Sequence, residues 1–324
     1  MAKVDEIAVK GNLKSFLRKI ISGGYGSLIA LIGLFILSSY ISPYFLTRVN
    51  IFNLLRQSSI YGFMSLGMTL VILSGGIDLS VGGVMTLCSI LAAILSLSGE
   101  INLLLIILLP ILVGGIFGLA NGFIISKFKV EPFVITLGSQ FVAFGFGYSL
   151  CGGRTVLPTL SPQIEFLCNG FIGSVPFPVI LLGTTYAIFG FLMSNTAFGR
   201  HINALGGNER AVQFCGINVS LMKIVIYSIS GCLAGFSGVL MLSRSTVGDP
   251  TAGIAVVLTI IASVIVGGNH FVGGIGNVGF TLIGLLILGI LGNILNMLGV
   301  VFYVQQIIQG IIVITAVVIS TRID

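Results

Sequence analysis

One carboxylate lies deep inside apolar sequence and is the group in this chain best placed for chemistry. Two hydrophobic runs flank a short polar insert at 74–80, Ser-Gly-Gly-Ile-Asp-Leu-Ser, which contains Asp78. Gly75 and Gly76 allow the backbone to leave helical geometry, and Asp78 and Ser80 are suited to capping a following helix. We therefore expect a helix that is interrupted at 74–80.

Other residue types that do chemistry are scattered. No G-x-x-x-x-G-K-[ST] phosphate loop occurs, and His201 and His270 lack neighbouring metal-ligand or triad partners. The Gly-x-Gly-x-x-Gly stretch at 274–279 opens an apolar run without a preceding soluble strand, which favours a tight turn over a dinucleotide site. Cys151 and Cys168 flank one loop, and free thiols are expected there rather than a disulfide. We expect no catalytic residue, no metal and no cofactor.

Composition defines the class of protein. The 324 residues are 56% hydrophobic and 7% charged, with a mean hydropathy of +1.16. Apolar runs near the ~20 residues needed to cross a bilayer recur along the chain, and the short alternating segments of a β-barrel are missing. The sequence predicts an all-α, polytopic helical membrane protein with about ten transmembrane helices. Its basic residues are not gathered on one face, so nucleic acid is not an expected partner.

The predicted organisation is a segment at 1–22, one transmembrane domain at 23–320 and a tail at 321–324. Spans are expected at 25–41, in the two runs beside the insert, and at 101–125, 132–150, 179–193, a run ending near 242, 252–266, 278–298 and 302–319. The fourth span carries Gly114, Gly118 and Gly122 at four-residue spacing, which favours close helix packing.

Basic residues predict the orientation, because they concentrate on the cytoplasmic side of membrane proteins. With both termini in the cytoplasm, 11 of the 15 Lys and Arg residues fall inside: Lys3, Lys10, Lys14, Arg18, Lys19, Lys127, Lys129, Arg200, Arg210, Lys223 and Arg322. The other 4 fall outside: Arg48, Arg56, Arg154 and Arg244. The inverted topology would reverse this bias.

In such a membrane protein, Asp78 becomes a candidate functional residue, because an ionisable side chain inside a span is by default a functional group. An interrupted span is tolerated where protein or a water-filled cavity satisfies its freed backbone groups. We expect the stretch at 74–80 to line a path across the membrane. The alternative is that Asp78 only caps a helix at a membrane surface.

Two polar connections separate the apolar runs. Residues 151–178 are rich in proline and are expected to form an external loop with a short helix of its own. Residues 195–223 are predicted to be cytoplasmic, with a short helix at 209–214 between glycine-containing turns. This second loop is interpreted as a docking element for a cytoplasmic partner, against the alternative of a plain solvated loop.

At four ordered places the sequence resembles the permease subunits of sugar-type ABC importers, the ribose and galactose group. The stretches are LGMTLVILSGGIDLSVGGVMTL (66–87), EPFVITLGS (131–139), GRHINALGGNERAVQFCGINV (199–219) and VGGNHFVGGIGNVGFTLIGLLILGILGNILNMLGV (266–300). In that family the third stretch is the loop that couples the permease to its ATPase. The resemblance assigns this role here to Gly207, Asn208, Glu209, Arg210, Ala211 and Gly216.

The resemblance implies a multi-pass subunit of a bacterial plasma (inner) membrane, embedded in the lipid bilayer. It implies a second permease copy or a paralogue, a cytoplasmic ABC ATPase and an extracytoplasmic substrate-binding protein as partners. ATP hydrolysis would then belong to the separate ATPase, and this chain would not be an enzyme. The implied substrate is a monosaccharide such as a ribose-like pentose, and inositol or a furanone autoinducer are alternatives.

One stretch departs from the family pattern. Members carry acidic residues just before the glycines that follow the eighth span, whereas residues 255–263 here contain none. The chain also lacks tryptophan, so any stacking on a sugar must use Phe or Tyr. These departures leave the substrate open, and they favour pairing with a different permease as a second possibility. A stand-alone secondary transporter remains the competing function, and a membrane-embedded enzyme ranks third.

Overall fold

The computed structural model describes residues 25–99 and 102–323, so the predicted N-terminal segment at 1–22 lies outside the described residues. The chain is helical apart from one two-stranded ladder, β1 (Phe171–Ile172) with β2 (Val175–Pro176). The helices are α2 (Tyr25–Ile41), α3 (Arg48–Leu73), α4 (Val81–Ser96), α5 (Leu103–Phe128), α6 (Pro132–Cys151), α7 (Pro162–Asn169), α8 (Phe177–Asn195), α9 (Ala197–Gly207), α10 (Glu209–Phe214), α11 (Val219–Ser245), α12 (Val256–Val266), α13 (Val278–Met297) and α14 (Phe302–Ile323).

A helix occurs at each of the predicted spans, but the helices differ in length. In the described part of the chain, 5 are long and apolar enough to cross a membrane by themselves: α5, α6, α8, α11 and α13. α4 and α12 have only 16 and 11 residues. At 1.5 Å per residue neither reaches across the ~30 Å hydrocarbon layer alone. Each of these two helices is preceded by a non-helical segment, at 74–80 and at 246–255 respectively.

α3 forms the centre of the molecule, with α8, α9, α11, α12 and α13 packed around it. Nearly every residue from Ser58 to Leu73 is buried, although several are polar. Their hydroxyls bond to neighbouring helices: Ser65 lies 2.8 Å from the Ser263 hydroxyl, and Thr69 lies 2.6 Å from that of Thr281. In an apolar surrounding such interhelical bonds help fix the position of α3.

α5 packs against α11 through small residues. Gly118 lies so close to α11 that a Cβ would overlap the Tyr227 carbonyl oxygen and sit 2.8 Å from the Ser228 Cα. Gly114 lies in the same way against the carbonyl of Gly231, and a Cβ on Gly122 would be 2.6 Å from the Ile224 Cα. The predicted glycine face therefore lies where the α5 and α11 backbones meet.

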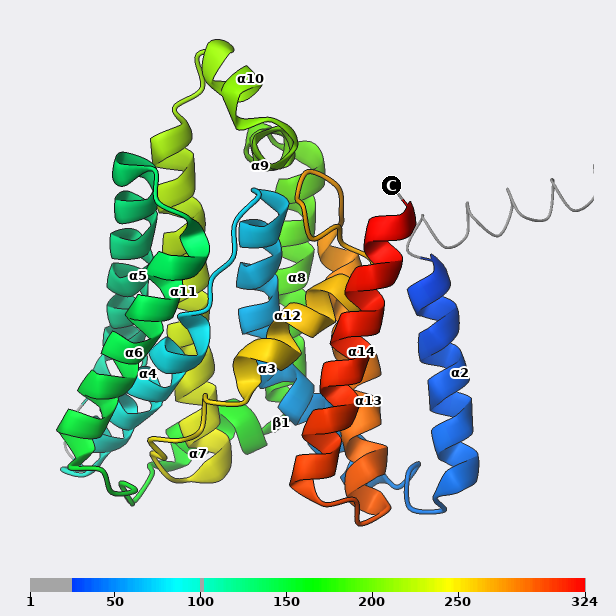
Figure 1. The fold of residues 1–324 in the computed structure, drawn as a ribbon. Coiled ribbons are helices and arrows are strands. Elements are labelled where there is room, and N and C mark those ends of the chain that lie inside the picture. Colours follow the sequence, from blue (N-terminus) through cyan, green and yellow to red (C-terminus); the bar gives the residue numbers. More distant parts are fainter. Residues whose placement is uncertain (1–24, 100–101, 324) are drawn as a thin grey trace, which may run out of the picture.

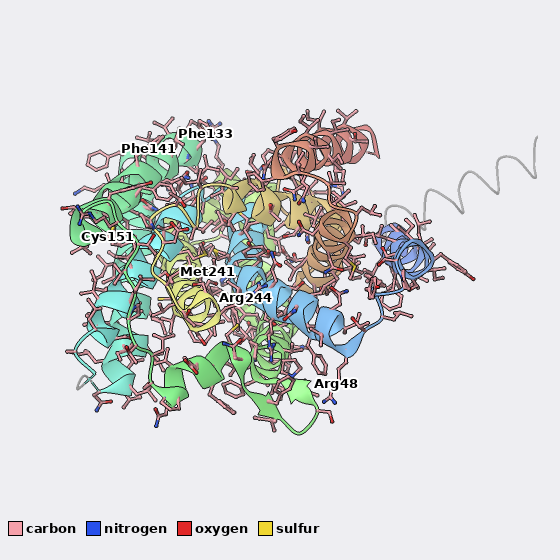
Figure 2. All side chains as sticks on the ribbon, turned by 90° about the horizontal axis from the view of Figure 1, so that it is seen from below. Arg48, Phe133, Phe141, Cys151, Met241 and Arg244 are labelled. Carbon is pink, nitrogen blue, oxygen red and sulfur yellow. The ribbon has the colours of Figure 1, made fainter. Side chains whose placement is uncertain are left out.

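The helices run between two ends of the molecule (Figure 1). α9 and α10 project at one end, where α2 begins and α14 finishes; α7 and the strand ladder lie at the other. Figure 2 views the second end, with Arg48 and Arg244 at the ends of α3 and α11. Several of the basic residues that determine the predicted bias lie in 1–22, outside the described residues, so the orientation stays a prediction.

Two sequence predictions need correction here. The eighth span was expected at 252–266, but its helix begins at Val256, and residues 250–255 form turns. The chain is not purely α, because the external loop contains the small ladder besides the expected short helix, α7. Cys151 and Cys168 are both free thiols, in line with the expectation.

The α5–α11 contact predicts a matched pair of outcomes. Gly118→Ala should destabilise the protein by about 1–3 kcal/mol, because the added methyl group meets rigid backbone. Gly138→Ala on α6 makes the same change where a Cβ meets nothing within 4 Å, and should be neutral. Thermal unfolding in detergent checks this, and equal melting temperatures for both variants would contradict the contact.

Candidate functional site

The interruption predicted at 74–80 begins with a tight turn at the end of α3. The Gly75 amide donates to the Ile72 carbonyl at 2.9 Å, and the Gly76 amide donates to the Val71 carbonyl at 3.0 Å. Gly75 has a φ of 81°, in the left-handed region that glycine adopts without strain. These bonds satisfy carbonyls that the end of a helix leaves free. The chain then runs extended to α4, which starts part-way between the two ends of the molecule (Figure 1).

A side chain of α11 hydrogen-bonds the backbone of the insert at 74–80. The Tyr227 hydroxyl donates to the Ile77 carbonyl at 3.2 Å, and it lies directly against Gly76, where any Cβ would collide with it. An unpaired carbonyl in a membrane interior costs several kcal/mol, as an order of magnitude. Tyr227 therefore removes a large part of the penalty for leaving helical geometry at this point.

Asp78 is the centre of a buried polar network. Its side chain is 0% exposed. One carboxylate oxygen accepts hydrogen bonds from the Ser80 amide at 3.0 Å and from the Ser80 hydroxyl, and the other accepts from the Ser230 hydroxyl at 2.8 Å. The Asn121 side-chain amide donates to Ser80 at 3.0 Å. α5, α11 and the insert are thereby tied together through a single carboxyl group.

This network changes the role expected for Ser80. Ser80 occupies the N-cap position of α4, but its side chain makes no capping hydrogen bond to the helix, because it donates to Asp78 instead. Asp78 likewise bonds the Ser80 amide and not an amide of the first turn. The sequence pointed to Asp78 and Ser80 but missed Ser230 and Asn121. Their only signal was a polar residue in the middle of an apolar helix.

A second non-helical segment, at 246–255, contacts α4 just beyond the first. Residues 246–255 lead from the end of α11 to α12, which also begins part-way between the ends (Figure 1). Asp249 accepts from the Thr251 amide and hydroxyl, both at 2.8 Å, and so repeats the Asp78–Ser80 arrangement. The Gly253 amide donates to the Thr86 hydroxyl at 2.9 Å, on α4. The sequence carries the cue, Asp-Leu-Ser-Val-Gly at 78–82 against Asp-Pro-Thr-Ala-Gly at 249–253, and our sequence prediction overlooked it.

The polar loop between α8 and α11 is largely helical. It contains α9 and, at the predicted bounds Glu209–Phe214, α10. The Asn208 side chain accepts a hydrogen bond from the Ala211 amide at 3.0 Å and so caps α10. Lys223 and Glu209 form an ion pair at 2.7 Å, which fixes α10 to the start of α11. α10 is therefore a short helix whose position is fixed by its cap and by the ion pair to α11.

α10 presents an exposed aromatic side chain. Phe214 is 91% exposed at the tip of this projecting helix, while Val212 is buried beneath it. Arg210 is also exposed, and Gly216 turns the chain with a φ of 79°. Isolated exposed apolar residues are common, but a large aromatic among polar neighbours on a projecting helix suits protein contact. Phe214 was not singled out from the sequence, although a phenylalanine inside a polar loop was the available cue.

The loop touches the beginning of the insert through glycines. A Cβ on Gly206, at the end of α9, would overlap the Leu73 carbonyl and the Gly274 amide. That same Gly274 amide donates to the Leu73 carbonyl at 3.0 Å, and a Cβ on Gly273 would lie 2.9 Å from the Gly75 amide nitrogen. We call this contact of Leu73, Gly75, Gly206, Gly273 and Gly274 the glycine junction.

The chemistry that the described residues can support follows from their arrangement. Among the described residues, no group of three or more His, Cys, Asp and Glu side chains lies together to hold a metal ion. The Asp78 carboxylate is enclosed by hydroxyl and amide donors, with no accessible nucleophile or base beside it. Long apolar helices, two non-helical segments that precede short apolar helices, and a projecting loop joined to one of these segments are typical of a polytopic membrane protein.

Comparison with known proteins gives the particular family. Residues 50–317 match the model of the permease component of branched-chain amino acid transport systems, and the chain belongs to this family. Within it, the sequence is that of a permease of the sugar-type ABC importers, the ribose and galactose group, located in a bacterial plasma (inner) membrane. No solved structure matches the chain.

The relatives are similar over nearly their whole length. The ribose import permease protein RbsC of Haemophilus influenzae is 38% identical, covering 90% of this chain and 91% of that protein. RbsC of Bacillus subtilis is also 38% identical, with 92% of both chains covered. The D-allose transport system permease protein AlsC of Escherichia coli is 35% identical over 90% of each chain.

The Asp78 network predicts graded effects on stability. Asp78→Leu should lower the melting temperature strongly, because the Ser80 and Ser230 hydroxyls and the Ser80 amide lose a buried acceptor. Asp78→Asn keeps the shape and one carbonyl acceptor and should fall between the wild type and the leucine variant. Thermal unfolding in detergent measures the order, and a leucine variant as stable as the wild type would rule out a structural role for the carboxyl group.

Proposed function

We propose that this chain is the permease subunit through which a bacterial ABC importer moves a ribose-like monosaccharide. The observation that supports the substrate class best is the 38% identity to ribose import permeases over nine-tenths of both chains. An external binding protein would deliver the sugar, and a cytoplasmic ATPase would drive its passage. This chain would hydrolyse no ATP.

The proposed topology has ten spans, with both termini and α10 in the cytoplasm. It is supported by the helices that lie at the ten predicted spans, of which five are long and apolar enough to cross a membrane alone. It is also supported by the common end at which α2 begins, α14 finishes and α10 projects (Figure 1). Two permeases, either two copies of this chain or this chain with a paralogue, would enclose the path.

The glycine junction offers a mechanical route for coupling. An ATPase seated on α10 displaces α9, and Gly206 then pushes directly on the end of α3 and on the loop before α13. Since glycine leaves no side chain to absorb the displacement, movement reaches the insert at Gly75. Coupling of this kind requires a contiguous element with two arrangements, and the extended insert between α3 and α4 is suited to that role. The hydrogen bonds of Asp78 would stabilise one of the two arrangements of this insert.

The test is co-purification of the N-terminally tagged chain from its native membrane, followed by uptake in liposomes. Recovery of an ABC-type ATPase, together with ATP-dependent uptake of D-ribose when the matching binding protein is added, is the expected result. A homogeneous protein without an ATPase that moves solute without ATP would establish a secondary transporter instead.

Phe214 predicts a selective loss of the ATPase. Phe214→Ser removes the exposed aromatic from α10 and should reduce the co-purified ATPase at least about fivefold, since buried aromatics dominate interface energies. Leu157→Ser is the matched control, because Leu157 is 71% exposed in the loop at the opposite end. Both variants should be expressed equally. Equal retention of the ATPase would exclude Phe214 from the docking surface.

The native cysteines test the orientation. A membrane-impermeant maleimide should label exposed Cys215, beside α10, only in inside-out vesicles, and Cys151, at the end of α6, only in intact spheroplasts. Cys168 lies in the same external loop but should resist labelling, because burial raises the pKa of its thiol to about 11. Labelling of Cys215 from outside would invert the topology, and Cys215→Ser identifies its band.

A further inference from the structure

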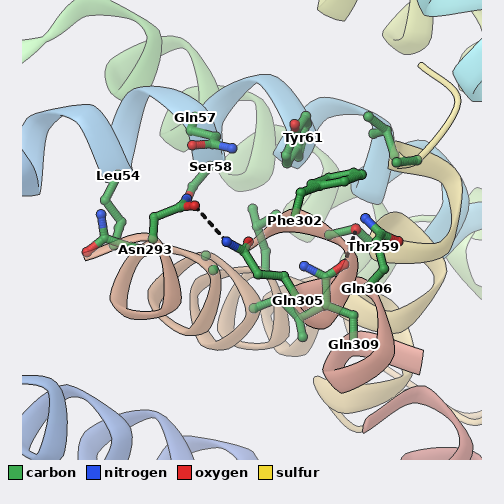
Figure 3. Close-up of a pocket in the computed structure, with 17 residues that line it drawn as sticks. Leu54, Gln57, Ser58, Tyr61, Thr259, Asn293, Phe302, Gln305, Gln306 and Gln309 are labelled. Atoms are coloured by element: carbon green, nitrogen blue, oxygen red, sulfur yellow. Dashed lines mark hydrogen bonds between the residues drawn. The ribbon is translucent and has the colours of Figure 1, made fainter. Parts of the chain in front are cut away.

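A cavity with several polar lining residues lies away from the Asp78 network. It has a volume of about 220 Å³ and is lined by α3, α12, α13 and α14 (Figure 3). This volume is below the roughly 300 Å³ at which pockets for drug-sized ligands begin, and suits a small solute. Its lining residues on α3 and α14 lie towards the ends of those helices that face away from α10 (Figure 1).

Six side-chain amides lie among the residues that line this cavity, whose remaining lining is mostly apolar. Gln57, Asn293, Asn296, Gln305, Gln306 and Gln309 contribute to it from three helices. Gln305 is bound by the Asn296 side chain and the Val300 carbonyl, both at 2.8 Å, so its position is fixed. The Gln309 side-chain oxygen accepts only a long bond, 3.4 Å, from Thr259. Several amides therefore retain donors and acceptors for a ligand.

A buried hydroxyl in the lining has no partner. Ser58 is 4% exposed, and within the described residues its Oγ makes no hydrogen bond. Gly289 faces it, since a Cβ there would stand 2.8 Å from that Oγ and compete for the space. Buried polar groups are nearly always paired, and an unpaired one calls for a specific explanation such as a ligand or an ordered water. Because the Oγ itself is covered, Ser58 is an unsatisfied polar group in the wall of the cavity and does not contact a solute directly.

The chemistry of the lining restricts the ligand. No acidic or basic residue belongs to it, so a charged solute would be left unpaired at a high cost in desolvation. Amides and hydroxyls both donate and accept, which matches the hydroxyl groups of a polyol. Tyr61 and Phe302 supply aromatic faces on which the C–H face of a sugar ring can stack (Figure 3).

The cavity continues towards the middle of the molecule. A second cavity of about 230 Å³ shares Thr259, Leu288, Gln306 and Gln309 with the first and extends along α14 to Ile314. Its remaining lining is apolar, so hydrogen-bonding groups are concentrated at the outer of the two. This ordering suits a site that receives a solute first and passes it on towards a weaker one.

We propose that the cavity formed by α3, α12, α13 and α14 binds a neutral, polyhydroxylated solute within the permease itself. The inference rests on the proposed function for the identity of the solute as the transported sugar. Beyond the proposed function, the inference gives this subunit a binding site of its own that is selective for uncharged polyols. Gln57, Gln306 and Gln309 supply the hydrogen bonds, and Tyr61 and Phe302 supply the stacking faces.

Direct binding tests the site without relying on transport. The purified chain in detergent is titrated with D-ribose, D-allose and L-arabinose by saturation-transfer NMR, with L-glutamate as a charged comparison. Gly292→Leu fills the cavity, because Gly292 lines it and a Cβ there meets nothing within 4 Å. Gly183→Leu on α8 is the matched control, also a helical glycine with nothing within 4 Å. Gln309→Leu removes an amide and serves as the second cavity variant.

The expected result is binding of at least one sugar, but not of glutamate, by the wild type and by Gly183→Leu. The apparent Kd should rise at least about tenfold in Gly292→Leu and Gln309→Leu, as expected when several hydrogen bonds are lost or blocked. Equal sugar binding by all four proteins, or none by a folded wild type, overturns the proposal. ATP-driven uptake, measured separately with the co-purified partners, decides the proposed function and is not needed to interpret the binding result.

Discussion

The structure depends on satisfying backbone polar groups where the chain leaves helical geometry inside a membrane. No water is available there, so each freed amide or carbonyl needs a protein partner. The insert at 74–80 meets this constraint through local turns, through Tyr227 at the Ile77 carbonyl and through the carboxylate of Asp78. The second non-helical segment contains a similar Asp249–Thr251 turn, but this turn is exposed, so water can also satisfy its polar groups. Carboxylates suit this task because one group accepts several hydrogen bonds at once.

Close backbone contact is the second requirement, and glycine meets it in two ways. Along α5 and α11 it brings two helices together so that hydroxyls such as Ser230 reach Asp78. At the glycine junction it lets α9, the end of α3 and the loop before α13 touch backbone to backbone. The first use makes a rigid wall around the insert. The second places the loop between α8 and α11 directly against the start of the non-helical insert at 74–80.

The sequence was sufficient to predict those features of the fold that depend on local residue patterns. Apolar runs located the helices, glycine beside Asp78 located the interruption at 74–80, and the flanking glycines located α10. It failed where the outcome depends on distant partners. Ser80 was expected to cap α4, but Asp78 holds its hydroxyl, and Ser230 joins the network from 152 positions beyond Asp78. The cavity on α14 was missed because its amides are dispersed over three helices in sequence and converge only in the fold.

These two regions differ in how fully their polar groups are paired. The Asp78 network is closed: its side chain is 0% exposed, and both carboxylate oxygens accept hydrogen bonds. The cavity lined by α3, α12, α13 and α14 contains no charged residue, and its Gln309 oxygen accepts only a 3.4 Å bond, so we propose that it retains hydrogen-bonding capacity for a solute. A transport protein needs both, because contacts that hold the path in one shape must outlast the solute, whereas contacts with the solute must break for it to leave. The carboxyl group of Asp78 therefore lies where hydrogen bonds must persist, and neutral amides lie where hydrogen bonds must be exchanged.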